Sequence, residues 1–93
     1  MTARIMLEAR LDTSAASKLM AQIETAEGND LVLDASGVEM LGGLCLEAIL
    51  NARHRWSQAE ASFCVENGSE AFVIDLGTLG LGIDELGYEV VTA

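Results

Sequence analysis

The spacing of apolar residues along the chain follows two patterns, which occur in turn. Short apolar runs bounded by turn residues predict β-strands at 4–9, 31–35, 61–65 and 88–92. Between these runs, apolar residues recur three and four positions apart, which predicts helices at 13–25, 43–57 and 69–76. Strands that alternate with helices are typical of an α/β fold with a mainly parallel sheet.

The predicted helix at 43–57 shows the helical spacing most clearly. One stripe carries Cys45, Ile49, Ala52 and Trp56, widened by Leu46 and Leu50, while Glu47, Asn51 and Arg55 share the opposite face. In the other two helices we expect the following residues to face inward: Ala16, Leu19, Met20, Ile23, Phe72, Val73 and Leu76. Asp12 and Ser69 precede these helices and are suitable N-caps.

These elements predict the architecture of one domain over residues 1–93. We expect a four- or five-stranded mixed, mainly parallel sheet with 31–35 as its central strand, flanked by three to four helices. The fourth helix is at most a helical turn, at 83–86.

The net charge and the short apolar runs argue against several classes of function. The net charge is −10, from 15 acidic and 5 basic residues, which disfavours binding to nucleic acid or anionic lipid. The apolar runs are too short to insert into a membrane, and the start lacks a signal-peptide pattern, so we expect a cytoplasmic protein. The acidic charge either keeps the domain soluble or steers it to a basic partner.

Residues with catalytic or metal-binding chemistry are scattered. The two cysteines, Cys45 and Cys64, lie far apart and outside any zinc-ligand spacing, and both are expected in the core. The sequence places no nucleophile and no orienting group beside His54, so it predicts no catalytic role for this residue. Asp34, at the end of a strand, is expected to accept hydrogen bonds from loop amides. The sequence therefore predicts no enzyme, no metal and no cofactor.

Two glycines, Gly42 and Gly43, occupy the start of the helix at 43–57, where Ser, Thr or Asp would normally provide a cap. Glycine at an N-cap costs only a few tenths of a kcal/mol relative to serine and lets the backbone turn freely. A bare backbone also lets a binding partner approach closely. Both interpretations are open from the sequence alone.

The segment at 31–56, LVLDASGVEMLGGLCLEAILNARHRW, resembles the STAS domain family, named after sulfate transporters and anti-sigma factor antagonists. ARLDTSAASKLMAQI is similar to the family's first helix entry, and FCVENGSEAFVIDLGTLGLGIDEL to its last strand and helix. The resemblance covers nearly the whole chain and implies a STAS-like fold. Many members have an extra strand at the start, where this chain has room for one strand only, or for a bent one.

The resemblance also implies a departure from the family at the two glycines. In anti-sigma factor antagonists this loop carries an aspartate followed by a serine that a partner kinase phosphorylates. Gly42 matches the aspartate and Gly43 the serine, so neither position can carry phosphate. Ser36 is the alternative phosphate acceptor nearby.

The function implied is that of a regulatory module in bacterial signal transduction and transcription regulation. Its partner would be an anti-sigma factor or a related histidine-kinase-like ATPase. One alternative is an accessory protein of a bacterial chemotaxis system, because small stand-alone STAS proteins with a similar LGG-x-CL loop resemble such accessory proteins. Another alternative is a STAS subunit that binds an ABC-type ATPase in lipid transport. The expected partner-binding residues are Val38, Glu39, Met40, Leu41, Gly42, Gly43, Leu44 and Glu47.

Overall fold

The chain forms an α/β fold, as the alternation of patterns predicts. A computed structural model describes residues 1–80 and 88–89. Its sheet has the order β1-β3-β5-β6, with every pair parallel, and a separate parallel pair joins β2 to β4. The strands are β1 (Thr2–Met6), β2 (Arg10–Leu11), β3 (Asp30–Asp34), β4 (Met40–Leu41), β5 (Phe63–Glu66) and β6 (Tyr88–Glu89). The helices are η1 (Thr13–Ala15, a 3-10 turn), α1 (Ala16–Thr25), α2 (Gly43–Gln58) and α3 (Glu70–Thr78).

The main strand predictions are confirmed, with two differences. β3 lies between β1 and β5, so the predicted central strand is central. The described pairings are all parallel rather than mixed, and β2 and β4 were not predicted because two residues are too few to show a pattern. The predicted turn at 83–86 and the residues at 90–92 lie outside the described part of the chain.

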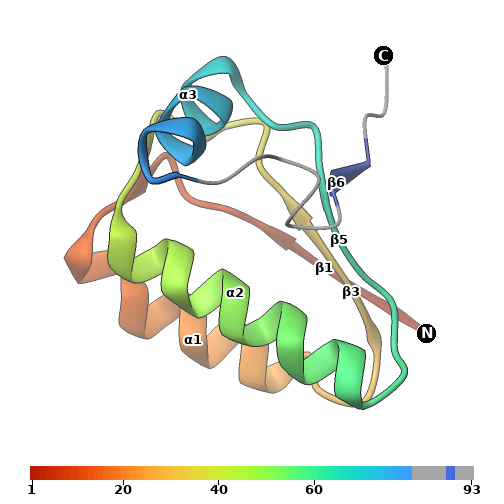
Figure 1. Ribbon diagram of the computed structural model, residues 1–93. Helices are drawn as coiled ribbons and strands as arrows, with labels where there is room; N and C mark the ends of the chain where they lie inside the picture. The colour runs from red at the N-terminus through yellow and green to blue at the C-terminus, as the bar shows by residue number, and fades with distance from the viewer. Residues whose placement is uncertain (81–87, 90–93) are drawn as a thin grey trace.

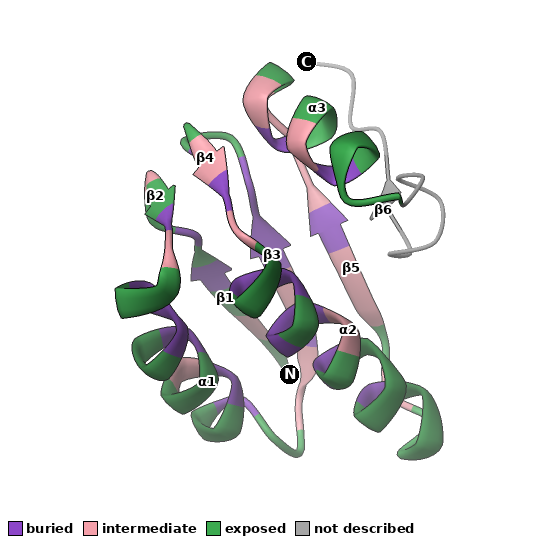
Figure 2. Cartoon of the chain, turned by 60° about the vertical axis from the view of Figure 1, so that its left-hand side comes forward, coloured by how far each residue is buried: buried purple, intermediate pink, exposed green. Residues whose placement is uncertain are grey.

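Helices α1 and α2 lie side by side on one face of the sheet (Figure 1). In the sheet, β3 lies next to β1 and β5 lies next to β3, so the strands follow one another in a single direction across the sheet. Right-handed crossovers then place both connecting helices on the same face of the sheet. The buried sides of both helices face the sheet (Figure 2). Along β1 the buried Ile5 alternates with the exposed Arg4 and Met6, which therefore point to the opposite face of the sheet.

One apolar core fills the space between the helices and the sheet. Its largest fully buried side chains come from every layer: Leu11, Leu31, Leu33, Cys45, Ile49, Val65, Phe72 and Leu76. Trp56 is also buried, as predicted. Met20 and Val73 are exposed, contrary to prediction, because the buried stripes are narrower than expected: only Ala16, Leu19 and Ile23 are buried on α1, and only Phe72 and Leu76 on α3.

The longest of these helices, α2, has 16 residues. Within the described residues, no helix combines the length and the apolar character needed to cross a membrane.

Candidate functional site

The loop from Val38 to Gly43 lies beyond the carboxyl end of β3 and contains the edge strand β4. The N–H groups of Glu39 and Met40 donate to the Ala9 carbonyl oxygen at 2.7 and 3.1 Å, and the Gly42 N–H donates to that of Leu11 at 2.8 Å. These bonds join the loop to the segment that leads into η1 and α1 (Figure 2). The candidate site is therefore built on hydrogen-bonded backbone rather than on an unsupported loop.

The predicted partner-binding residues divide into a buried and an exposed set. Val38 and Leu41 are buried and anchor the loop to the core, so Leu41 offers no apolar contact to a partner. Met40 and Gly42 are half-buried. The exposed set comprises Glu39, Gly43, Leu44, which is 46% exposed, and Glu47.

The two glycines differ in what surrounds them. Gly42 is the N-cap of α2, with extended backbone at φ −92° and ψ 162° and no side chain to cap the helix. A Cβ on Gly42 would lie 3.0 Å from the Leu11 carbonyl oxygen, whereas a Cβ on Gly43 would meet nothing within 4 Å. Packing against Leu11 thus explains the glycine at 42, while Gly43 presents bare backbone to the surface.

Three side chains outside the predicted site hold the loop and its surroundings. The Ser69 hydroxyl donates to the Val38 carbonyl oxygen at 2.5 Å, and the Asp75 carboxylate accepts from the Leu41 N–H at 2.9 Å. The Cys45 thiol donates to the Asp12 carbonyl oxygen at 3.3 Å.

Sequence reasoning found part of this arrangement. It identified Ser69 and Asp12 as helix caps, and both predictions are confirmed, because Ser69 accepts from the Phe72 N–H and Asp12 from the Ala15 N–H. The contacts from Ser69, Asp75 and Cys45 to the loop region were missed. They span more than thirty positions, and no local pattern encodes a pairing over that separation.

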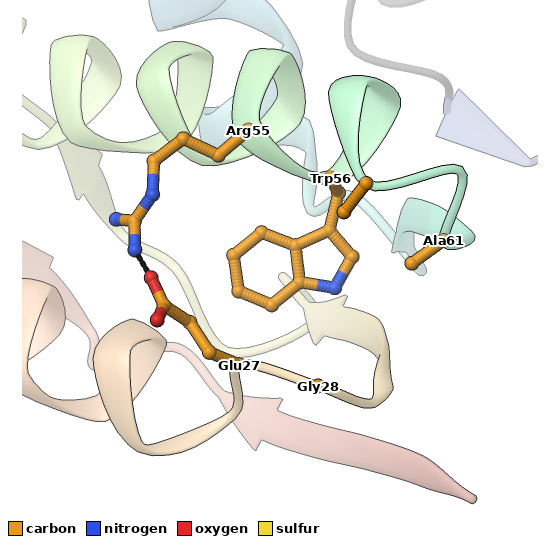
Figure 3. Close-up of a pocket in the computed structure, with 6 residues that line it drawn as sticks. Glu27, Gly28, Arg55, Trp56 and Ala61 are labelled. Atoms are coloured by element: carbon orange, nitrogen blue, oxygen red, sulfur yellow. Dashed lines mark ion pairs between the residues drawn. The ribbon is translucent and has the colours of Figure 1, made fainter.

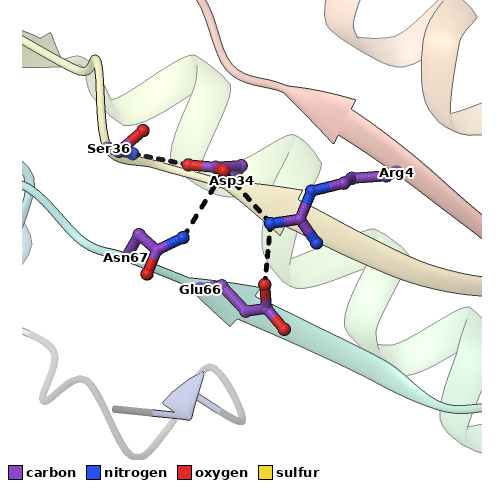
Figure 4. A network of polar contacts seen from close by, with 5 residues as sticks. All are labelled: Arg4, Asp34, Ser36, Glu66 and Asn67. Atoms are coloured by element: carbon purple, nitrogen blue, oxygen red, sulfur yellow. Dashed lines mark hydrogen bonds and ion pairs between the residues drawn. The ribbon is translucent and has the colours of Figure 1, made fainter. Parts of the chain in front are cut away.

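A polar network lies at the end of β3, on the sheet face that α1 and α2 leave uncovered (Figure 4). Asp34, only 6% exposed, accepts from the Ser36 N–H at 2.9 Å, which confirms the expectation that it bonds a loop amide. It also contacts Arg4 at 3.2 Å and Asn67 at 3.5 Å, and Arg4 pairs with Glu66 at 2.9 Å.

The electrostatics of this network favour the charged forms of its members. The pKa of Asp34 is lowered, chiefly by the hydrogen bond from the Ser36 backbone and then by the Ser36 side chain, Arg4 and Asn67. The pKa of Arg4 is raised, first by its bond to Glu66. An ionised carboxylate occupied by several donors is a poor proton donor or acceptor at neutral pH, and the contacts of Asp34 and Arg4 join β1, β3 and the end of β5. Ser36 itself is exposed, beside these carboxylates.

The two thiols lie in different environments. Cys45 is fully buried, and burial is the main cause of its raised pKa, with a further contribution from Asp12. Cys64 is only half-buried, which corrects the expectation that it belongs to the core. Its place on β5 between Phe63 and the buried Val65 points its side chain to the uncovered face of the sheet.

A cavity of about 360 Å³ opens at the amino ends of β3 and β5, away from the candidate loop. It lies beside the ion pair between Arg55 and Glu27 and the indole of Trp56 (Figure 3), and is also lined by Gly28, Ala59 and Ala61. The indole N–H already donates to the Asn29 carbonyl oxygen at 2.7 Å. None of the predicted site residues lines this cavity, which offers a ligand few unpaired polar groups.

Over residues 1–80 and 88–89, no group of three or more His, Cys, Asp and Glu side chains is placed to hold a metal ion. No protein-family model matches the chain, and no curated protein matches it significantly.

Proposed function

We propose that this chain is a non-enzymatic, STAS-type regulatory module of the anti-sigma factor antagonist kind. It binds a protein partner in the bacterial cytoplasm through the exposed residues of the loop and the first turns of α2. The proposed partner is an anti-sigma factor or a related histidine-kinase-like ATPase. The family assignment rests on the sequence resemblance, and the α/β fold with a mainly parallel sheet is compatible with it.

One observation carries the choice of surface. At the start of α2, Gly43 offers bare backbone and Leu44 an exposed apolar side chain, beside the half-buried Met40. An exposed apolar side chain beside backbone that carries no side chain would give a partner both apolar contact and close approach to the backbone. Glu39 and Glu47 flank this spot and favour a partner with basic residues around an apolar contact.

The same residues support a module without the family's phosphorylation switch. Gly43 has no hydroxyl, so binding is constitutive or is regulated through the partner. A Cβ on Gly42 would lie only 3.0 Å from the Leu11 carbonyl oxygen, so a side chain at position 42 is disfavoured as well. Phosphate on Ser36 would adjoin Asp34 and Glu66 and be repelled by both carboxylates.

Affinity capture from the source bacterium tests this proposal. A tag at Met1 is placed far from the loop, because Met1 adjoins Asp30 at the amino ends of the strands. The bait is compared with two variants, Gly43→Asp on the proposed surface and Asn51→Asp on the exposed face of α2 two turns further along.

We expect a kinase-like ATPase that the wild type and Asn51→Asp retain and Gly43→Asp loses, verified with the purified partner by calorimetry. An ABC-type ATPase with the same binding profile would instead support the lipid-transport alternative. Chemotaxis proteins with that profile would support the chemotaxis alternative. A partner held equally by all three baits would contradict the proposed surface.

A further inference from the structure

Helix α3 reaches the candidate loop at two points. Ser69, at the N-cap of α3, donates to the carbonyl oxygen of Val38 at 2.5 Å. Asp75, six residues further along, accepts from the N–H of Leu41 at 2.9 Å. Both ends of the segment that contains Glu39 and Met40 are thus bonded to side chains of one helix.

The geometry of β4 explains why these bonds matter. In a strand, successive N–H groups point in opposite directions. The N–H groups of Met40 and Gly42 point to β2 and bond Ala9 and Leu11, so that of Leu41 points away from β2. An edge strand leaves such groups without a strand partner, and here the Asp75 carboxylate takes the partner's place.

Helix α3 is itself held in place by the core. Phe72 and Leu76, which flank Asp75 on the inner side of α3, are fully buried in the core. The Ser69 N–H donates to the Ala35 carbonyl oxygen at 3.2 Å, which ties the start of α3 to the end of β3. The position of α3 is therefore set by the core, and α3 holds one side of the loop while the backbone of Ala9 and Leu11 holds the other.

We infer that Ser69 and Asp75 are positioning residues for partner binding: they touch no partner, but fix the backbone that presents Glu39, Met40 and Gly43. This inference rests on the proposed function and adds to it that α3 controls the shape of the binding surface. Displacement of α3 would alter the loop without any change in the loop's own sequence.

Substitutions can separate this role from simple stabilisation of α3. Ser69→Asp keeps a good helix cap but replaces the donor to Val38 with an acceptor, which repels the carbonyl. Asp75→Ala removes the acceptor for the Leu41 N–H, whereas Asp75→Asn keeps an oxygen at that place. Glu70→Gln is the matched control, because Glu70 is an exposed acidic residue in the first turn of the same helix.

Amide hydrogen exchange and ¹⁵N-resolved spectra of the full chain test the inference directly. In Asp75→Ala we expect the Leu41 amide to exchange about tenfold faster or more, with α3 itself still protected. Asp75→Asn should restore most of the protection, and Glu70→Gln should match wild type. In Ser69→Asp the resonances of Glu39, Met40 and Gly43 should shift, while the amides of α3 keep their protection.

Wild-type exchange at Leu41 in Asp75→Ala would overturn the inference and leave the proposed function intact. If the loop is loosened, the kinase-like ATPase isolated by capture should bind Asp75→Ala about fivefold more weakly or worse, with Glu70→Gln unaffected. Unchanged affinity despite a loosened loop would overturn the positioning role and argue against the loop as the partner-binding surface.

Discussion

The carbonyl oxygen of Leu11 accepts the N–H of Gly42 at 2.8 Å and would lie 3.0 Å from a Cβ at the same residue. This single oxygen links β2 to the end of β4 and limits the residue that can stand at the N-cap of α2. Because Leu11 is itself 1% exposed and packed in the core, the oxygen has little freedom to move away. The missing helix cap at this position is a consequence of close packing.

The first prediction contrasts the two glycines. Gly42→Ala should lower the free energy of unfolding by about 1–3 kcal/mol, the usual cost of forcing extra atoms into a packed site. Gly43→Ala should leave it unchanged or raise it by up to about 1 kcal/mol, since the site is open and alanine favours the helix. Urea unfolding followed by the fluorescence of Trp56, the single tryptophan, measures both. Equal effects of the two changes would contradict the packing explanation.

The second prediction concerns partner binding. Gly43→Asp should fold normally, because a negative charge is favourable at a helix N-terminus. The charge would be buried against the partner, so affinity should fall about tenfold or more, equivalent to about 1.4 kcal/mol per decade. Gly43→Ser should bind like wild type.

Calorimetric titration of the purified partner measures this effect. Asn51→Asp, further along the exposed face of α2, and Glu60→Gln, at the far end of the molecule, serve as charge controls. Wild-type affinity of Gly43→Asp would show that the loop is not the interface. Phosphate found on Ser36 of the native protein would show that a phosphorylation switch exists after all, upstream of the family position.

The third prediction is a pH dependence that originates in Asp34. Its pKa in the folded state is lowered, chiefly by the Ser36 amide, so its contribution to stability is complete above the unfolded pKa of about 3.9. That contribution is lost as the pH falls through the lower folded pKa. Asp34→Asn should cost about 1–3 kcal/mol at neutral pH, because hydrogen bonds to a buried carboxylate are lost.

The difference between Asp34→Asn and wild type should shrink as the pH falls below about 4. Urea midpoints at neutral and acidic pH measure it. Glu24→Gln on the exposed face of α1 provides the control and should show no such convergence. A constant difference at all pH values would mean that Asp34 acts through packing rather than charge.

The fourth prediction separates the two thiols. Cys64 should react with a disulfide reagent at least about tenfold faster than Cys45 at mildly alkaline pH, because Cys45 is fully buried and its pKa is raised by that burial. Kinetics of Cys64→Ser and Cys45→Ser assign each phase. Fast reaction of Cys45 in the folded protein would instead point to an accessible thiol near the proposed interface and to redox control of binding.

The sequence by itself determined the α/β class, the central strand and the three main helices, because periodic apolar positions record which face of each element is buried. The stripe of Cys45, Ile49, Ala52 and Trp56 is one example, and all four are buried in the core. The helix caps Asp12 and Ser69 were also visible, since a cap acts within three residues of its own position.

Only the tertiary structure decided how the loop is built. The pairing of β2 with β4, the contact between Gly42 and Leu11, and the bonds from Ser69 and Asp75 join segments distant along the chain. Whether Leu41 or Leu44 faces solvent depends on those contacts, because both are apolar and lie within one short segment. Local patterns carry information over a few residues, whereas the side of a loop that is buried depends on which distant segment packs against it.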